Sequence, residues 1–368
     1  MTLSPLLQPT SFDDLPGWRG DRHGEAFAAF RLSARRALQQ PYKSGSLGID
    51  ATAFEKAFDV ADTADTFGDD TARAFFERWF LPCSVTADAG GSGFVTGFYE
   101  PEVAASPVRT DEFTVPLLGI PDDLVKIDDA NRPEGMDPYL AFGRKTPAGI
   151  TEYFDRSAIE KGALGDRASA LAWMVDPVDA FFVHVQGAAR LTMPDGSVKR
   201  VTYAAKSGQR FTGPGGLLVA MGEIPAAEIS MQAIRAWFRR NPHRVDEILH
   251  QNRSYIFFRF AEVEDTGMGP IAAAKVPLTA GRSMAVDRLL HTFATPFFVN
   301  APTLQAFDAT PFCRLMIAQD TGSAIVGPAR GDLFAGSGHA AGEIAGVIHH
   351  PADFYALVPR ALVGTGTT

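Results

Sequence analysis

The carboxylate best placed for acid catalysis is Asp320, which ends the run Arg314–Gln319. Residues 315–317 are Leu-Met-Ile, and such a continuous apolar run is typical of a strand buried on both faces. Gly322 follows closely and permits a tight turn. Burial raises the pKa of a carboxyl group because desolvation disfavours its charged form, so Asp320 could keep a proton to donate. An aspartate that opens a turn through a backbone hydrogen bond explains the same local pattern.

The tetrapeptide Asp320–Ser323 also matches the Asp-Thr-Gly signature of aspartic proteases. That chemistry requires two aspartates that share one proton, so a single-chain protease would carry a second copy. The other Asp-Thr-Gly, at 265–267, follows two glutamates in an acidic segment and lacks a preceding apolar strand. A protease is therefore an alternative that the sequence disfavours.

Other kinds of site are poorly supported. The eight histidines are scattered, no His-Glu-x-x-His or Cys-x-x-Cys pattern occurs, and no Gly-Lys-Ser/Thr loop is present, so we expect no metal and no cofactor. The net charge of −9 argues against a nucleic-acid partner. Cys83 and Cys313 are expected to be buried free thiols, although an oxidising compartment would allow them to pair. No signal-peptide pattern is visible, and no segment approaches the about 20 apolar residues of a membrane span.

The 368 residues favour two domains, and the many Gly and Pro residues favour short strands and turns. Helices are predicted at 25–40, after a cap at Asp50, at 70–80, after a cap at Ser230 with Trp237 inward, at 243–251 and at 353–357. Strands are predicted at 94–101, 181–187, 188–192 and 198–204 around an Asp195-Gly196 hairpin, then at 255–260, 275–278, 284–286, 297–300 and 313–319.

Three aspartates in the final third, Asp287, Asp320 and Asp332, end or flank apolar or Gly-rich segments. With several further blocks they resemble the lytic murein transglycosylase A family and its 3D domain, over roughly 95 to 360. The blocks are Phe94–Pro101, Asp179–Leu191, Tyr203–Gly208, Ser230–Arg235, Thr279–Ser283, Ala318–Gly322 and Arg330–Asp332. So many blocks in one order make the resemblance specific, which no single short motif would be.

The resemblance implies a mainly β protein with flanking helices. A double-psi β-barrel domain would comprise 1–102 and 246–368, with N-terminal helices, and a second β-barrel domain would be inserted at 103–245. A groove between the two would hold a glycan strand of peptidoglycan. The implied location is the periplasm or the outer membrane, with membrane contact only through a lipid anchor that this sequence does not contain. Cell-wall synthesis or remodelling proteins are possible partners.

The implied reaction cleaves the β-1,4 bond between N-acetylmuramic acid and N-acetylglucosamine and leaves a 1,6-anhydro end. Asp320 stands at the position of the family's catalytic aspartate, and Asp287 and Asp332 are assigned as supporting residues. Six residues have side chains of a type suited to substrate binding: Thr96, Tyr99, Glu100, Gln186, Ser230 and Arg282. Ser230 also fits the role of a helix cap.

The chain departs from the family pattern near these positions. Ser323 stands where a second glycine is usual, Val326 where a lysine is common, and Ala188-Ala189 replace a Ser-Gly pair. These departures keep open a second function, a peptidoglycan-binding protein without catalysis, because a fold does not determine an activity.

Overall fold

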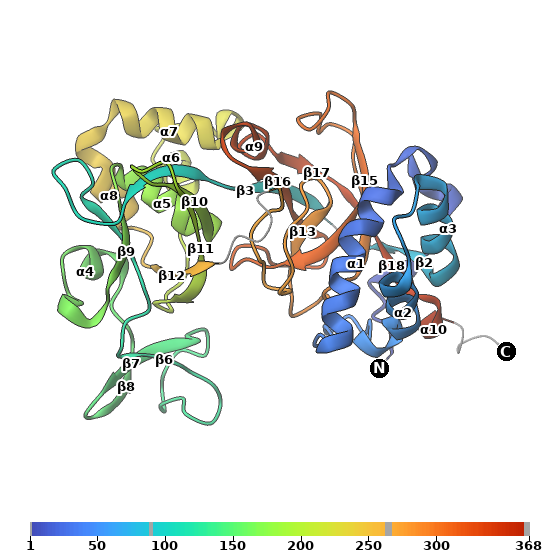
Figure 1. Ribbon diagram of the computed structural model, residues 1–368, viewed down its shortest axis with the longest axis horizontal. Helices are drawn as coiled ribbons and strands as arrows, with labels where there is room; N and C mark the ends of the chain where they lie inside the picture. Colours follow the sequence, from blue (N-terminus) through green and yellow to red (C-terminus); the bar gives the residue numbers. More distant parts are fainter. Residues whose placement is uncertain (1, 88–90, 262–266, 364–368) are drawn as a thin grey trace. The chain divides into compact units, whose positions relative to one another are not determined.

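The computed structural model describes residues 2–87, 91–261 and 267–363 (Figure 1). Its contacts divide the chain into two compact units, Met1–Tyr99 with Thr266–Thr368, and Glu100–Asp265. The first unit is thus built from both ends of the chain. The domain boundaries predicted from the sequence, after 102 and before 246, stay a prediction.

The first unit contains a nine-stranded sheet in the order β1-β2-β18-β14-β15-β13-β16-β3-β17. Its strands are β1 Leu7–Pro9, β2 Phe80–Val85, β3 Phe94–Glu100, β13 Ser283–Val286, β14 Pro296–Ala301, β15 Phe312–Asp320, β16 Arg330–Ser337, β17 His349–Pro351 and β18 Asp353–Pro359. Strand β13 pairs parallel with β15 and antiparallel with β16. Among the described residues this order does not return to its first strand, so the closed barrel stays a prediction.

Helices α1, α2 and α3 pack together beside the sheet of this unit (Figure 1). The helices are η1 Phe12–Asp14, η2 Trp18–Gly20, α1 His23–Gln39, η3 Ala51–Phe54, α2 Glu55–Thr63, α3 Asp69–Trp79, α9 His339–Ala345 and α10 Arg360–Val363. The three helices predicted near the N-terminus are confirmed. Asp50 caps η3, since its carboxylate accepts a hydrogen bond from the N–H of Thr52. Phenylalanine rings of α1 and α3 pack edge to face and form part of the hydrophobic core of this unit.

Strand β15 runs through the centre of this core. Leu315, Met316 and Ile317 are all 0% exposed, as expected for a strand buried on both faces. The strand lies between β14, its antiparallel neighbour, and β13, its parallel neighbour. Asp320 therefore ends a strand that is paired on both sides and buried through its centre.

The second unit contains a six-stranded sheet, β12-β11-β10-β4-β9-β5, and a three-stranded sheet, β6-β7-β8. Its strands are β4 Glu102–Ser106, β5 Val115–Leu118, β6 Leu124–Lys126, β7 Phe142–Thr146, β8 Gly149–Thr151, β9 Ala170–Met174, β10 Ala188–Thr192, β11 Val198–Lys206 and β12 Ile256–Ala261. Its helices are α4 Arg156–Glu160, η5 Gly165–Arg167, α5 Pro177–Gln186, α6 Pro214–Ala220, η6 Ala226–Glu228, α7 Met231–Arg240, η7 Pro242–Arg244 and α8 Val245–Leu249. The predicted hairpin between β10 and β11 is confirmed.

The strand predicted at 181–187 was wrong, because this segment is the second half of helix α5. The carboxylate of Asp176 accepts from the N–H of Val178, Pro177 is the first helical residue, and Gly187 ends the helix with φ 76°. The segment looked like a strand because it is apolar on every side. That composition arises because Phe181 and Val183 are buried in two different hydrophobic clusters.

Two further assignments were wrong. Residues 353–357 form part of strand β18, which pairs with β14 on one side and β2 on the other, instead of a helix. Residues 275–278 were predicted as a strand but form a turn with a single bridge between Ile271 and Pro277. Lys275 has φ 63° in this turn, a left-handed conformation that no regular strand contains.

Cys83 is buried, Cys313 is half-buried, and both are free thiols, as the sequence favoured.

Candidate active site

Asp320 is the last residue of β15 and is half-buried. The pairing between β13 and β15 shifts just before it, so that Met284 pairs with Ala318 while Ala285 pairs with Asp320. This shift is a bulge, an irregularity that commonly turns a side chain toward a functional site. The register therefore changes directly before Asp320, the last residue of the strand.

The surroundings of Asp320 favour its protonated form. Burial, with a smaller contribution from the negative charge of Asp332, raises the pKa of Asp320 to about 6. The N–H of Ala273 donates to Oδ1 of Asp320 at 3.1 Å, and it lowers the pKa together with the N–H of Thr321 and the charge of Lys275. The net effect is a carboxylic acid with a pKa near that of a general acid for neutral solution.

Asp332 is the second carboxylate of this region. It pairs with Ala285 from the other side, because β13 lies between β15 and β16. The hydroxyl of Thr96 donates to Oδ1 of Asp332 at 2.5 Å and accepts from the guanidinium of Arg330 at 2.7 Å. Burial raises the pKa of Asp332, while the Thr96 hydroxyl and Arg330 oppose that shift. The structure therefore brings together three of the predicted site residues: Thr96, Asp320 and Asp332.

Gln319 anchors the strand directly before the catalytic candidate. Its side-chain amide donates to the carbonyl of Ala29 and to the hydroxyl of Ser33, both in α1 and both at 2.8 Å. Its amide oxygen accepts from the hydroxyl of Ser283, the first residue of β13. Because Gln319 is 0% exposed, these bonds cannot be exchanged for water, and they tie β15 to α1 and β13.

Arg282 lies in the core and braces the same strand. It is 1% exposed, and its guanidinium donates to both carboxylate oxygens of Asp21 at 2.9 Å each. The same carboxylate accepts from the N–H of Leu315 at 2.7 Å. The geometry makes Arg282 a positioning residue for β15, and its predicted contact with substrate stays a prediction.

Asp287 holds the segment that follows Asp320. One of its carboxylate oxygens accepts from the N–H of Leu289 and the other from the N–H of Gly327, both at 3.0 Å. Asp287 thus closes its own turn and holds the backbone at Gly327, and its supporting role in catalysis stays a prediction. Ser323 and Val326, the two departures from the family pattern, are exposed on this loop.

The remaining candidates lie elsewhere. The ring of Tyr99 is buried against Gly342 of α9, where an added Cβ would come within 2.9 Å of it. Glu100 is the last residue of β3, the division between the two units falls directly before it, and it is 0% exposed. It pairs with Arg190 at 3.0 Å and with Arg200 at 2.7 Å.

Gln186 ends α5 of the second unit and is half-buried. The hydroxyl of Ser230 accepts from the N–H of Ala233, so Ser230 is the predicted helix cap of α7. The binding roles of Tyr99, Glu100, Gln186 and Ser230 stay predictions.

Four residues that act on Asp320 or brace strand β15 were not assigned from the sequence: Asp21, Ala273, Lys275 and Gln319. Gln319 carried a signal, since it is a polar residue inside an apolar run. No sequence pattern pointed to the other three. Asp21 contacts Leu315 across 294 residues of chain, and Ala273 acts through its backbone N–H, which no side-chain pattern reports.

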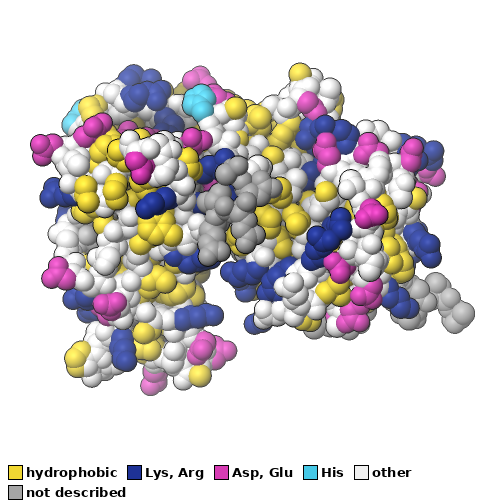
Figure 2. Space-filling view, viewed as in Figure 1, with side chains coloured by type: hydrophobic (Ala, Val, Ile, Leu, Met, Phe, Trp, Pro, Cys, Tyr) yellow, Lys and Arg dark blue, Asp and Glu magenta, His cyan; other side chains and the backbone are white. Residues whose placement is uncertain are grey.

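Within residues 2–87, 91–261 and 267–363, no group of three His, Cys, Asp or Glu side chains could hold a metal ion. None of the helices in these ranges has the length and apolar character to cross a membrane. Acidic and basic side chains are interspersed on the visible surface (Figure 2). Asp265, of the second Asp-Thr-Gly, lies outside the described residues.

Comparison with known proteins identifies the family. Residues 94–259 match the MltA specific insert domain, and residues 282–358 match the 3D domain. Membrane-bound lytic murein transglycosylase A of Escherichia coli K12 is 32% identical over 272 residues, which cover 72% of this chain. The chain spans 65% of the length of that relative.

Solved structures agree with this match. A membrane-bound lytic murein transglycosylase from Agrobacterium tumefaciens is 49% identical, with a TM-score of 0.91 over 97% of this chain and 99% of that one. MltA from Neisseria gonorrhoeae is 31% identical, with a TM-score of 0.77 over 98% and 93%. The predicted fold, a mainly β protein with helices, a 3D domain and an inserted domain, is confirmed in this form. The three aspartates and the ordered blocks around them thus led to the right family: the chain belongs to the MltA family of lytic murein transglycosylases.

Proposed function

We propose that this chain is a peptidoglycan lytic transglycosylase with Asp320 as its single acid and base. It cleaves the β-1,4 bond between N-acetylmuramic acid and N-acetylglucosamine and leaves 1,6-anhydromuramic acid ends. One observation carries this proposal: Asp320 ends a buried strand, and burial raises its pKa to about 6. About a tenth of such groups are protonated at pH 7, and most are at pH 5.

The reaction needs one proton to leave Asp320 and one to return. Protonated Asp320 donates to the glycosidic oxygen as the bond to C1 of N-acetylmuramic acid breaks. The resulting carboxylate then removes the proton of the C6 hydroxyl of that sugar, whose oxygen bonds to C1. No water is consumed, and Asp320 regains its proton. An attacking group within the substrate has a large effective molarity, so a second catalytic carboxylate is not required.

The neighbours of Asp320 support both halves of this cycle. Ionised Asp332 favours the proton on Asp320 before cleavage, and the N–H of Ala273 stabilises the carboxylate after it. Glu100 is the rival carboxylate, but the guanidinium groups of Arg190 and Arg200 occupy it. A crystal structure of E. coli MltA with bound chitohexaose supports a glycan as the substrate class. The names of the curated relatives, which are membrane-bound enzymes, support action at a membrane.

The test is the product. Wild-type protein incubated with insoluble sacculi is expected to release muropeptides that end in 1,6-anhydromuramic acid, identified by mass spectrometry. Asp320→Asn keeps an oxygen that can accept from Ala273 but cannot carry the proton, so it should lose at least about 10³-fold in rate. Gln8→Ala, an exposed position on the edge strand β1, is the control. Free reducing ends would overturn the proposed reaction, and sedimentation with sacculi without any cleavage would favour a binding protein.

A further inference from the structure

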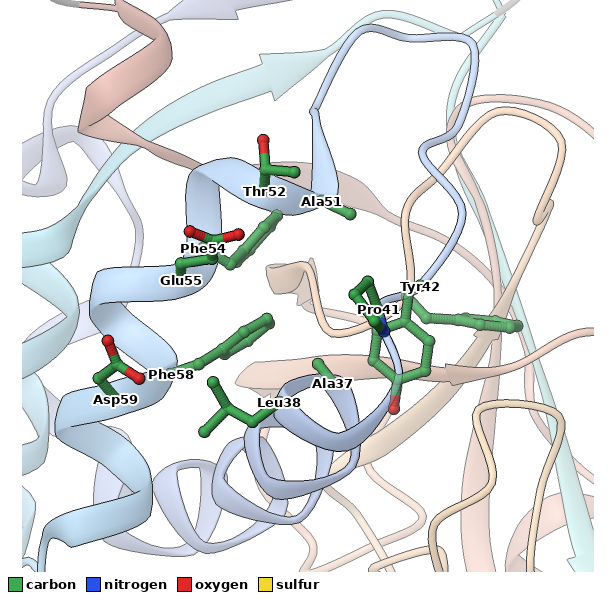
Figure 3. A pocket seen from close by; sticks show the side chains of 11 residues that line it. Ala37, Leu38, Pro41, Tyr42, Ala51, Thr52, Phe54, Glu55, Phe58 and Asp59 are labelled. Atoms are coloured by element: carbon green, nitrogen blue, oxygen red, sulfur yellow. The ribbon is translucent and has the colours of Figure 1, made fainter.

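A cavity of about 260 Å³ lies in the first unit, between the end of α1, the following segment, η3 and α2. Its walls are mostly apolar, and Figure 3 shows Phe54 and Phe58 on one side and Pro41 and Tyr42 on the other. Nothing in the proposed reaction uses these residues. The cavity is thus a separate feature of the unit that also carries Asp320.

Four aromatic residues line this cavity, of which Phe54 and Phe58 are buried and Tyr42 and Phe293 are half-buried. Phe54 and Phe58 are stacked, with ring centroids 5.4 Å apart and planes at 14°. Tyr42 and Phe293 meet edge to face, with centroids 5.8 Å apart and planes at 79°. Aromatic side chains offer a large apolar contact area to the body of a small ligand.

Two carboxylates stand at the rim. Glu55 and Asp59 are four residues apart on α2, so they lie on one face of the helix, and both are exposed. Across the part of the chain that the structure describes, no ion pair involves either side chain. An apolar cavity with an acidic rim complements a ligand that has an apolar body and one positive charge.

We propose that this cavity, defined by Tyr42, Phe54, Glu55, Phe58, Asp59 and Phe293, binds an organic ammonium ion. The aryl or alkyl body fills the space among the rings, and the ammonium group lies between the carboxylates of Glu55 and Asp59. A carboxylate ligand of the same shape is repelled by the rim. A neutral one gains the apolar contacts alone.

The cavity touches the segment that contacts Asp320. The hydroxyl of Tyr42 donates to the carbonyl of Ala274 at 2.9 Å. The N–H of the preceding residue, Ala273, donates to the carboxylate of Asp320. A ligand in the cavity therefore lies against the ring that tethers this turn. Binding itself does not depend on the proposed reaction, so the two can fail separately.

Titration calorimetry with phenethylamine tests the proposal. The wild-type protein is expected to bind it saturably with a Kd on the order of 1 mM, a normal affinity for so small a ligand. 2-Phenylethanol and 3-phenylpropionate, which share the ring, should bind at least about tenfold more weakly. Raising the salt concentration should weaken the amine, because the rim charges are exposed.

Two matched variants locate the site. Glu55→Gln with Asp59→Asn should weaken phenethylamine about tenfold, since it removes both rim charges and leaves the rings in place. Asp111→Asn with Glu112→Gln, an exposed acidic pair of the second unit, should leave the Kd unchanged. Thermal melts verify that both proteins fold.

Three outcomes would overturn the proposal: no saturable binding of phenethylamine, equal binding of the alcohol, or equal binding by the rim variant. Sedimentation of the wild-type protein adds a fourth. A concentration-dependent dimer that the rim variant cannot form would show that a second copy of the chain covers this cavity.

Discussion

Asp320 and Asp332 pair with the same residue, Ala285, from the two strands that flank β13. Two strand spacings of about 4.8 Å separate their backbones by roughly 10 Å. Across this separation the negative charge of Asp332 raises the pKa of Asp320. The two carboxylates also have different hydrogen-bond partners: the backbone N–H of Ala273 for Asp320, and the hydroxyl of Thr96 for Asp332.

This relationship predicts a shift in the pH dependence of cleavage. If protonated Asp320 is the acid, kcat/KM should fall about tenfold per pH unit above about pH 6. Asp332→Asn removes a charge that raises the pKa of Asp320, so the alkaline limb should move to lower pH. The Asn oxygen can still accept from Thr96, which keeps the local geometry. Initial rates from pH 4 to 9 measure this, and an unmoved or raised limb would contradict it.

Ionisation of Asp320 should destabilise the folded protein. Its folded pKa of about 6 lies above the ordinary value of 3.8, so the folded state binds the proton more tightly than the unfolded chain. This contribution is present below about pH 4 and is lost as the pH rises through 6. Asp320→Asn is therefore expected to raise the free energy of unfolding at pH 8 by up to about 3 kcal/mol. Urea unfolding at pH 3.5 should show no difference, and equal gains at both pH values would refute the assignment.

The buried ion pair of Arg282 and Asp21 should contribute far more to the free energy of unfolding than an exposed ion pair does. Arg282→Met leaves the carboxylate of Asp21 buried without its cation, and such losses lower the free energy of unfolding by about 3–5 kcal/mol. Arg19→Met is the matched control, because Arg19 pairs with Asp13 on the surface. Its midpoint in guanidinium chloride should be unchanged. Similar midpoints for the two variants would mean that Arg282 does not brace β15.

The hydroxyl of Tyr42 should act on Asp320 from a distance. Tyr42→Phe keeps the ring but releases the carbonyl of Ala274, which loosens the turn that presents the N–H of Ala273. That N–H lowers the pKa of Asp320, so its loss should move the alkaline limb of kcat/KM to higher pH. The direction is opposite to that of Asp332→Asn.

The groups that face Asp320 in this comparison are Asp332, Lys275 and the N–H groups of Ala273 and Thr321. Tyr355→Phe, a half-buried tyrosine of β18, is the control and should leave the limb in place. A structural role alone for Tyr42 would change the melting temperature without moving the pH profile.

Local sequence patterns predicted an element correctly where the residues that cause it lie close together along the chain. Caps at Asp50 and Ser230, the apolar run of β15 and the Asp195-Gly196 turn each act within a few residues, so these elements could be predicted. Prediction failed for α5 and β18, whose composition reflects burial between neighbours distant in sequence. An apolar segment buried on all sides has no periodicity that separates helix from strand.

The sequence by itself determined which carboxylate ends a buried strand, and with it the family and Asp320 as the candidate acid. Only the tertiary structure decided what surrounds that carboxylate. Asp332 acts across β13, Ala273 donates from a turn far back in the chain, and Asp21 braces Leu315 over 294 residues. These contacts join groups that are far apart along the chain. No sequence pattern predicts them, because only the pairing of the strands in the folded sheet brings the groups together.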